Sequence, residues 1–144
     1  MRRTLVLLFA VAAVAAAQAS SVQTQLKPGK WEVDVRMEIP NLPGGAMPPT
    51  KSLVCVTAET SKKPYMISTQ QQTGGDCQYG EPKVDGSKLT TAMTCQGGTV
   101  KGTFDIEVRN GGQAYSGVST MTVGGQAMKT IYDGKWVGAT CDQK

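Results

Sequence analysis

Three Gly-Gly pairs divide the stretch from Cys95 to Ile131 into segments in which apolar and polar residues alternate. The pairs are Gly97-Gly98, Gly111-Gly112 and Gly124-Gly125. Alternation with a period of two is typical of a half-buried β-strand, and glycine supplies the positive φ that tight hairpin turns require. This stretch therefore predicts a β-meander, which the rest of the chain extends and staples.

The turns also predict which side chains share a face, because strand register distributes side chains between the two faces of a sheet. Two-residue loops at Gly97-Gly98, Asn110-Gly111 and Gly124-Gly125 predict these opposed pairs: Cys95 with Val100, Leu89 with Ile106, Ile106 with Tyr115, Val100 with Met121, and Met121 with Met128. In this register Leu89, Phe104, Ile106, Tyr115 and Met121 face inward together. Charged residues such as Lys101 and Asp105 lie on the opposite, solvated face.

Residues Met1 to Ala19 have the organisation of a secretory signal peptide. Arg2 and Arg3 precede an apolar run that is too short for a comfortable membrane span, and Ala17-Gln18-Ala19 is a small-x-small cleavage site. Cleavage after Ala19 leaves residues 20–144, a length that suits a single β-domain. We therefore expect a periplasmic or secreted protein with no membrane span after the leader is removed.

The charge of the mature chain argues against nucleic acid as a partner. Loss of Arg2 and Arg3 lowers the formal net charge from +4 to +2, which leaves no basic footprint for a polyanion. The expected partner is instead an unknown envelope protein or a small apolar ligand, and the expected oligomeric state is a monomer.

The four cysteines, Cys55, Cys77, Cys95 and Cys141, are an even number in a chain with a leader and so predict two disulfides. Three pairings are possible. Register favours Cys77–Cys95, because a three-residue turn at Asp85-Gly86-Ser87 puts Val84 opposite Lys88 and Cys77 opposite Cys95. Cys55–Cys141 then follows by exclusion. A structural zinc site is disfavoured, because such sites usually contain closely spaced cysteine pairs.

Two further strands are predicted ahead of the meander. Lys30–Ile39 alternates strictly between apolar and charged residues, and Lys51–Val56 follows it. The intervening segment, Pro40–Thr50, is rich in proline and glycine but carries the apolar residues Leu42 and Met47. It is either a connector packed on the core or a lid or partner-binding loop.

Other boundaries follow from turn and capping residues. Thr57 is a candidate N-cap for a short helical turn, and Ser68–Gly75 is expected to be a polar loop. Pro82 suggests that the strand after Cys77 lies at an edge or is bulged. Asp133-Gly134 is expected to break or bend the last strand, after which Lys135–Cys141 returns toward the first.

Segments spread over nearly the whole mature chain resemble one bacterial family. They are Leu26–Val33 (LKPGKWEV), the Pro/Gly/Met loop after it, Cys55-Val56-Thr57, Asp76-Cys77, Met93-Thr94-Cys95 and the closing Gly138–Cys141. The resemblance is to the exported family catalogued as domain of unknown function 3617, and the four-cysteine layout is its most specific part. It implies a small periplasmic or secreted β-domain. Because the family has no assigned activity, the resemblance implies no activity for this chain and supplies no site residues. The closing segment is longer than the family's Gly-x-Cys ending.

The residue types available for catalysis are few. The chain has no histidine, which excludes nucleophiles paired with an imidazole base and histidine-bearing zinc sites. The acid pairs Glu32/Asp34 and Asp105/Glu107 are expected on a charged outer face, where cross-strand charge pairing explains them better than catalysis. We therefore predict a protein that is not an enzyme and has no catalytic residue.

Methionine offers the other candidate chemistry. Met37, Met93, Met121 and Met128 share the inward parity. Thioethers can bind Cu(I), but methionine is also an adaptable filler of irregular cores, and core packing is the favoured interpretation. We therefore predict no cofactor and no metal site.

Two functions suit such a domain, which is expected to be an all-β antiparallel up-and-down meander of seven or eight strands, forming a curved sheet or small barrel. The first is a non-catalytic envelope binding or interaction module that uses Pro40–Thr50 or an exposed sheet edge. The second is a small-ligand carrier, because Gly29-x-Trp31 is similar to the opening of the ligand-holding calycin barrels. A carrier needs an apolar pocket of about 300 Å3 or more. Its predicted lining is Trp31, Met93, Phe104, Tyr115 and Met121.

Overall fold

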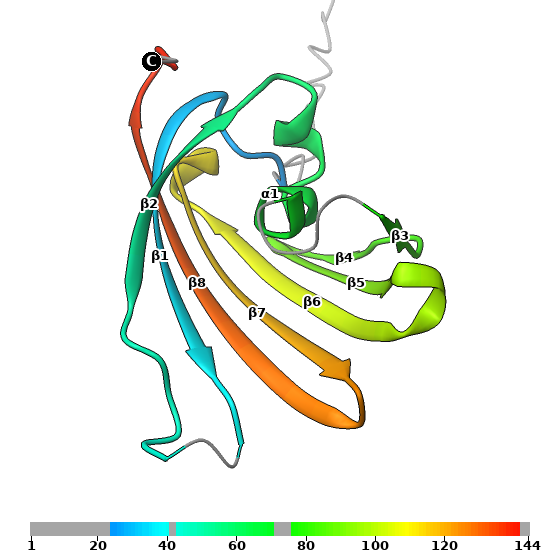
Figure 1. Ribbon diagram of the computed structural model, residues 1–144. Coiled ribbons are helices and arrows are strands. Elements are labelled where there is room, and N and C mark those ends of the chain that lie inside the picture. Colours follow the sequence, from blue (N-terminus) through cyan, green and yellow to red (C-terminus); the bar gives the residue numbers. More distant parts are fainter. Residues whose placement is uncertain (1–23, 41–42, 71–75, 142–144) are drawn as a thin grey trace, which may run out of the picture.

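The computed structural model describes residues 24–40, 43–70 and 76–141. These residues form one antiparallel sheet of eight strands, curled into a half-barrel (Figure 1). The strands are β1 (Gly29–Glu38), β2 (Thr50–Val56), β3 (Cys77–Tyr79), β4 (Lys83–Asp85), β5 (Lys88–Cys95), β6 (Val100–Arg109), β7 (Ala114–Val123) and β8 (Gln126–Gly138). A short 3-10 turn, η1 (Thr60–Lys62), and a helix, α1 (Tyr65–Gln70), follow β2. The predicted leader, Met1–Ala19, lies outside the described residues.

The strand order across the sheet is β2-β1-β8-β7-β6-β5-β3, and β4 also pairs with β5. The last strand, β8, returns to pair with β1, as predicted. Within the described ranges, β2 pairs only with β1, and β3 and β4 pair only with β5. The sheet is therefore strongly curved but open, which is the first of the two predicted shapes.

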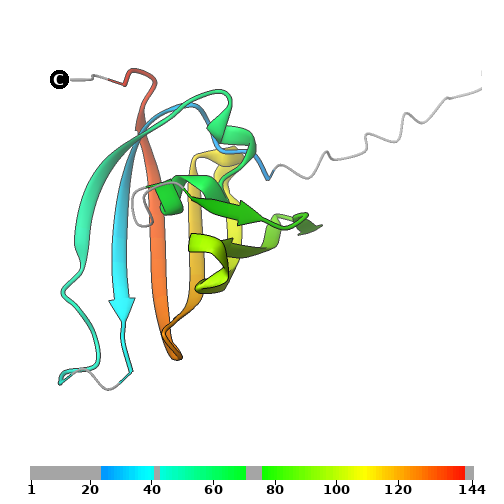
Figure 2. The same cartoon turned by 45° about the vertical axis from the view of Figure 1, so that its right-hand side comes forward.

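The concave face of the sheet forms the core. The five residues predicted to face inward, Leu89, Phe104, Ile106, Tyr115 and Met121, are all buried in one hydrophobic cluster. The helix α1 lies inside the curl of the sheet (Figure 2), where Tyr65 and Ile67 join the same cluster. The predicted assignment of faces is therefore confirmed.

Two of the three predicted hairpin registers are confirmed, because Cys95 lies opposite Val100 and Met121 lies opposite Met128. The register between β6 and β7 was predicted wrongly, since Tyr115 lies opposite Val108 rather than Ile106.

The cause of this error is the length of the loop. The β6–β7 connection spans residues 110–113 rather than Asn110-Gly111 alone, and Asn110, Gly111 and Gly112 all have positive φ. The extra residues shift the register by two. A shift of two leaves every side chain on its predicted face, because side chains alternate with a period of two.

The hairpin before β5 also differs in part from the prediction. Cys77 lies opposite Cys95 as expected, but Val84 lies opposite Leu89 rather than Lys88. The segment around Pro82 separates β3 from β4 and introduces one extra residue between the two registers. Proline has no N–H to donate to a neighbouring strand, so the ladder is interrupted there and the edge strand is broken into two short pieces.

Two other boundaries were predicted wrongly. Asp133-Gly134 does not break β8, which runs without interruption from Gln126 to Gly138. Ser68 belongs to α1 rather than to a loop; residues 71–75 of that predicted loop lie outside the described part. Burial of Tyr65 and Ile67 holds this short helix against the sheet, and short helices depend on tertiary packing more than on propensity.

The predicted helical turn at Thr57 is present, since its hydroxyl accepts the Thr60 N–H at 3.1 Å.

Candidate functional site

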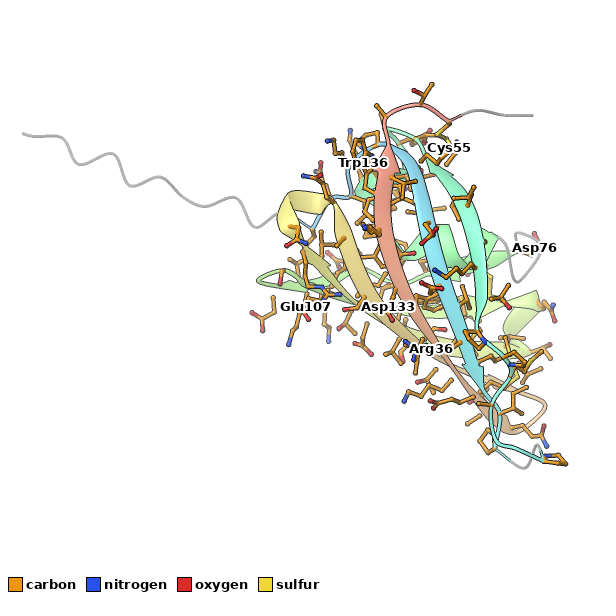
Figure 3. All side chains as sticks on the ribbon, turned by 90° about the vertical axis from the view of Figure 1, so that its left-hand side faces the viewer. Arg36, Cys55, Asp76, Glu107, Asp133 and Trp136 are labelled. Carbon is orange, nitrogen blue, oxygen red and sulfur yellow. A yellow bond between two sulfur atoms is a disulfide. The ribbon has the colours of Figure 1, made fainter. Side chains whose placement is uncertain are left out.

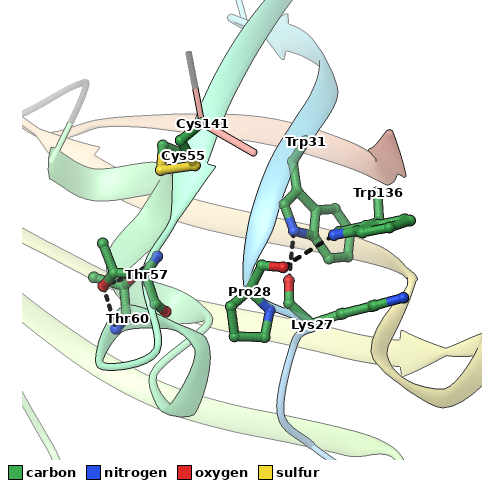
Figure 4. Close-up of a disulfide and its surroundings, with 8 residues drawn as sticks. All are labelled: Lys27, Pro28, Trp31, Cys55, Thr57, Thr60, Trp136 and Cys141. Atoms are coloured by element: carbon green, nitrogen blue, oxygen red, sulfur yellow. Dashed lines mark hydrogen bonds between the residues drawn. A yellow bond between two sulfur atoms is a disulfide. The ribbon is translucent and has the colours of Figure 1, made fainter. Parts of the chain in front are cut away.

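The Leu26–Val33 segment, one of those that carry the family resemblance, has a structural role. Trp31 donates its indole N–H to the Lys27 carbonyl (2.9 Å), and Trp136 donates its own to the Pro28 carbonyl (3.1 Å) (Figure 4). The Lys27 ammonium lies 3.8 Å from the centre of the Trp136 ring, within the range of a cation–π contact. Gly29 has a φ of 135°, and a Cβ there would overlap the Gly138 carbonyl. This N-terminal clamp fastens the chain before β1 to the end of β8.

The residues predicted to line a ligand cavity are core residues. Trp31, Met93, Phe104, Tyr115 and Met121 are all buried in the same cluster. The rings of Trp31 and Tyr115 lie 5.6 Å apart, and Phe104 packs against Tyr132 at 6.4 Å. These side chains therefore pack on one another in the core on the concave face.

Burial raises the pKa of Tyr115 well above its ordinary value of 10, with smaller contributions from Tyr132 and Asp133. The folded state consequently binds the phenolic proton more tightly than the unfolded chain does. Stability from this group is complete below pH 10 and is lost as the pH rises above it. We expect the free energy of unfolding of the wild type, relative to that of Tyr115→Phe, to fall by up to about 1.4 kcal/mol for each pH unit above pH 10. Urea denaturation at pH 8 to 11 measures this, and parallel curves for the two proteins would contradict it.

The predicted acid pairs lie on the convex face of the sheet, among basic partners. Lys51 on β2 lies 3.4 Å from Glu32 and 3.7 Å from Asp34, and its hydrogen bond to Glu32 raises the Lys51 pKa. Arg36 pairs with Asp133 at 3.2 Å on the same face (Figure 3). Cross-strand charge pairing thus accounts for Glu32 and Asp34, as the sequence predicted. Asp105 of the second pair instead accepts a hydrogen bond from the Thr90 hydroxyl at 2.7 Å. Exposed pairs of this kind contribute little to stability.

The two edges of the sheet differ. At one edge β3 and β4 are short and separated by the segment that contains Pro82. At the other edge β2 runs unbroken over seven residues, and within the described chain it pairs on one side only. Leu53, at the centre of β2, is 64% exposed on the convex face. The disulfide between Cys55 and Cys141 fastens the end of β2 to the C-terminal segment (Figure 4).

Sequence reasoning did not single out Leu53. The sequence feature that could have identified it is the pair Leu53-Val54, in which two adjacent apolar residues interrupt the alternation of the strand. One of two such neighbours must face outward, because successive side chains point to opposite faces.

The Pro40–Thr50 loop lies at the open end of the half-barrel. Met47 is 48% exposed, and Leu42 lies outside the described residues. A hollow of about 490 Å3 lies beside the end of β1, the loop, β7 and β8. Its apolar lining residues include Ile39, Pro40, Ala46 and Met128, and its lining also includes Thr120 and the ion pair of Glu38 with Lys129. We call this the open-end cavity.

A second hollow, of about 690 Å3, lies beside the Cys77–Cys95 disulfide. Its lining is polar, with Gln78, Thr94 and Gln96, and Asp76 is its only ionisable residue. Among the described residues, no group of three or more His, Cys, Asp or Glu side chains could hold a metal ion. This hollow therefore lacks the clustered groups that acid–base or metal chemistry requires.

Both disulfides join the predicted partners, Cys77 with Cys95 and Cys55 with Cys141. With this framework in view, residues 26–141 match the family described as "Protein of unknown function (DUF3617)". The chain belongs to DUF3617. The matched region begins with the N-terminal clamp at Leu26 and ends at the disulfide of Cys141. The DUF3617 match therefore covers the whole disulfide-linked sheet. No curated protein and no solved structure gives a significant match.

Proposed function

We propose that this DUF3617 protein is an exported, non-catalytic binding module that holds an extended segment of a partner protein against the free edge of β2. The observation that carries the proposal is the contrast between the two edges. Of the two edges formed by the described residues, only β2 offers a continuous row of backbone groups without proline, with an exposed leucine at its centre. Extended segments bind such edges by main-chain hydrogen bonds, while side-chain contacts supply specificity.

The usual protection of an edge strand is weak here. Proteins often guard exposed edges with charged side chains, above all lysine. The single lysine of β2, Lys51, is held by Glu32 and Asp34 of its own sheet. Its ammonium group therefore lies over β1 and does not project along the free edge of β2.

The edge is also held rigid at one end by the Cys55–Cys141 disulfide. A binding edge that is already ordered loses less conformational entropy when a partner adds a strand. The alternative function, a carrier of a small apolar ligand, would have to place its ligand among side chains that pack on one another, and this favours the module.

Export is supported by the state of the cysteines. All four are paired, and structural disulfides persist in oxidising compartments. Among the residues that the structure describes, no helix is both long and apolar enough to cross a membrane. The leader predicted at Met1–Ala19 agrees with an envelope or secreted location.

Leu53→Lys tests the proposal, with Val84→Lys as its matched control. Val84 is 52% exposed on β4 at the opposite edge, so both variants add a charge to an exposed edge residue. A photoreactive residue at Thr50, which is exposed on β2, would identify the partner in the producing cells, and titration calorimetry would then measure its affinity. We expect Leu53→Lys to weaken binding about 5- to 30-fold, because a central apolar contact is worth roughly 1 to 2 kcal/mol, and Val84→Lys to leave it unchanged.

Amide exchange supplies a second readout. Binding by strand addition should slow exchange across Thr50–Val56, because backbone N–H groups at the edge become hydrogen-bonded. Equal loss of affinity in both variants, or unchanged exchange in β2, would refute the proposed site.

A further inference from the structure

Two loops leave the sheet side by side at the open end of the half-barrel (Figure 1). The first connects β1 to β2, and the second connects β7 to β8. Glu38 at the end of β1 lies opposite Lys129 near the start of β8, so both loops are at the same end of the sheet. Residues of both line the open-end cavity. We call residues 43–49 and 123–127 the open-end tips.

The open-end tips are exposed and uncharged. Every residue in them is exposed, and the largest apolar side chains are those of Met47 (48%) and Val123 (37%). The sequence has no Asp, Glu, Lys or Arg in residues 39–50 or 120–128. Exposed apolar patches without charge mark surfaces that contact a partner or a membrane.

The tips project beyond the rest of the molecule. A Cβ added to any of their four glycines would meet nothing within 4 Å. The first tip is nevertheless held in place, because Met47 donates its N–H to the Met37 carbonyl at 2.9 Å and so continues the β1–β2 ladder. The tips are therefore protrusions on a rigid scaffold rather than the walls of a pocket.

The opposite end of the sheet differs in charge and in cover. The connection that follows β2 carries the exposed charged residues Glu59, Lys62 and Lys63. The β6–β7 loop is covered by the N-terminal segment, since Lys27 donates its N–H to the Gly112 carbonyl at 2.7 Å. The molecule therefore has one charged end and one end with uncharged, projecting apolar loops.

We propose that the open-end tips insert into the surface of a lipid bilayer and hold the half-barrel with its open end against the membrane. A fluid bilayer buries projecting apolar side chains without a matching shape, whereas a protein interface requires close complementarity. The absence of charge in the tip sequences favours the same partner, because burying an unpaired charge in an apolar medium is costly. Irregular backbone is not stable within the hydrocarbon core, so the insertion reaches only the boundary between headgroups and acyl chains.

Burial of apolar area, rather than surface charge, drives this contact. At the base of the tips Glu38 and Lys129 neutralise each other through an ion pair at 3.4 Å. Binding should therefore be similar for neutral and anionic lipids and should change little with salt. With few apolar side chains to bury, the association constant is expected to be at or below the roughly 10⁴ M⁻¹ that a single myristoyl chain provides.

The test is co-sedimentation with vesicles of phosphatidylcholine, which carry no net charge, at increasing lipid concentration. The wild type should bind. Met47→Glu should lower the partition coefficient at least about threefold, because burial of the exposed half of a methionine side chain is worth roughly 3- to 10-fold. Val84→Glu is the matched control, since Val84 is 52% exposed on β4, which pairs with the start of β5 away from the open end. It gains the same charge and should bind as the wild type does.

A tryptophan at each position supplies a second readout. In vesicles that contain brominated phosphatidylcholine, the emission of Met47→Trp should be quenched and that of Val84→Trp should not. The native tryptophans add little to this signal, because Trp31 is fully buried and Trp136 lies in the N-terminal clamp at the opposite end. All four substitutions replace exposed side chains, so the variants are expected to fold, and circular dichroism checks this.

Three results would overturn the proposal: no binding of the wild type to neutral vesicles, equal loss of binding in the two glutamate variants, or quenching at position 84 but not at position 47. A protein cross-linked from position 47, together with no vesicle binding, would assign the tips to a protein partner instead. The inference is independent of the β2 edge. Leu53→Lys should leave vesicle binding unchanged, so each proposal can fail alone.

Discussion

Replacing both Cys55 and Cys141 with alanine is expected to lower the free energy of unfolding by about 4 to 5 kcal/mol, by the chain-entropy estimate. The two residues are 86 apart in the sequence, and their bond restricts most of the unfolded chain. In the folded state it holds β2 to the C-terminal segment. Among the residues that the structure describes, β2 has a neighbouring strand on one side only. Urea denaturation followed by tryptophan fluorescence measures the loss.

The matched variant replaces Cys77 and Cys95 with alanine. These residues are 18 apart and lie opposite each other on adjacent strands, so the same estimate gives about 3 kcal/mol. Amide exchange should distinguish the variants further, with faster exchange in β2 only when the Cys55–Cys141 bond is absent. A larger loss for the shorter loop would show that entropy of the unfolded chain is not the main source of stability.

Gly134→Ala is expected to destabilise the protein by about 3 kcal/mol, at the upper end of what overpacking of a core usually costs. Gly134 lies on β8 directly opposite Tyr115 of β7, and the Tyr115 ring covers its Cα. A methyl group at this position would overlap Cδ1 and Cε1 of the ring. Because Tyr115 also packs against Trp31, the ring cannot move aside without disturbing the core.

Gly138→Ala is the matched control, because Gly138 is on the same strand and a Cβ there meets nothing within 4 Å. Its effect on the free energy of unfolding should stay within about 0.5 kcal/mol. A double variant, Gly134→Ala/Tyr115→Leu, should lose less than the sum of the two single variants, because the smaller side chain removes the overlap. Strict additivity would contradict the assigned contact.

The Cys77–Cys95 disulfide and Gly134 show which contacts local sequence patterns can predict and which they cannot. The disulfide Cys77–Cys95 was predictable from sequence, because register across one hairpin depends on residues close together in the chain. The role of Gly134 was not. A Gly after Asp is a usual turn signal, and only the position of Tyr115 on the neighbouring strand shows that this glycine lies inside a continuous strand to make room for a ring.

The candidate site residues also divide into those whose role the sequence could predict and those whose role it could not. Met47 was predictable as an apolar residue in a proline-rich loop. Trp31, Phe104, Tyr115 and Met121 were predicted to line a ligand cavity, but they lie in one buried cluster of the protein's own side chains. Alternation tells which residues share a face but not whether that face is filled by the protein's own side chains. That depends on how tightly the sheet curls and on α1, which enters the curl.

The sequence by itself determined the all-β class, the assignment of residues to the two faces, both disulfide pairings and membership of the family. Each of these depends on spacing along the chain, since a strand alternates its side chains wherever it is placed. Only the tertiary structure decided that the sheet stays open and that β2 is its long free edge among the described residues. These features arise from contacts between segments far apart in the chain and from the geometry of loops, which alternation does not encode.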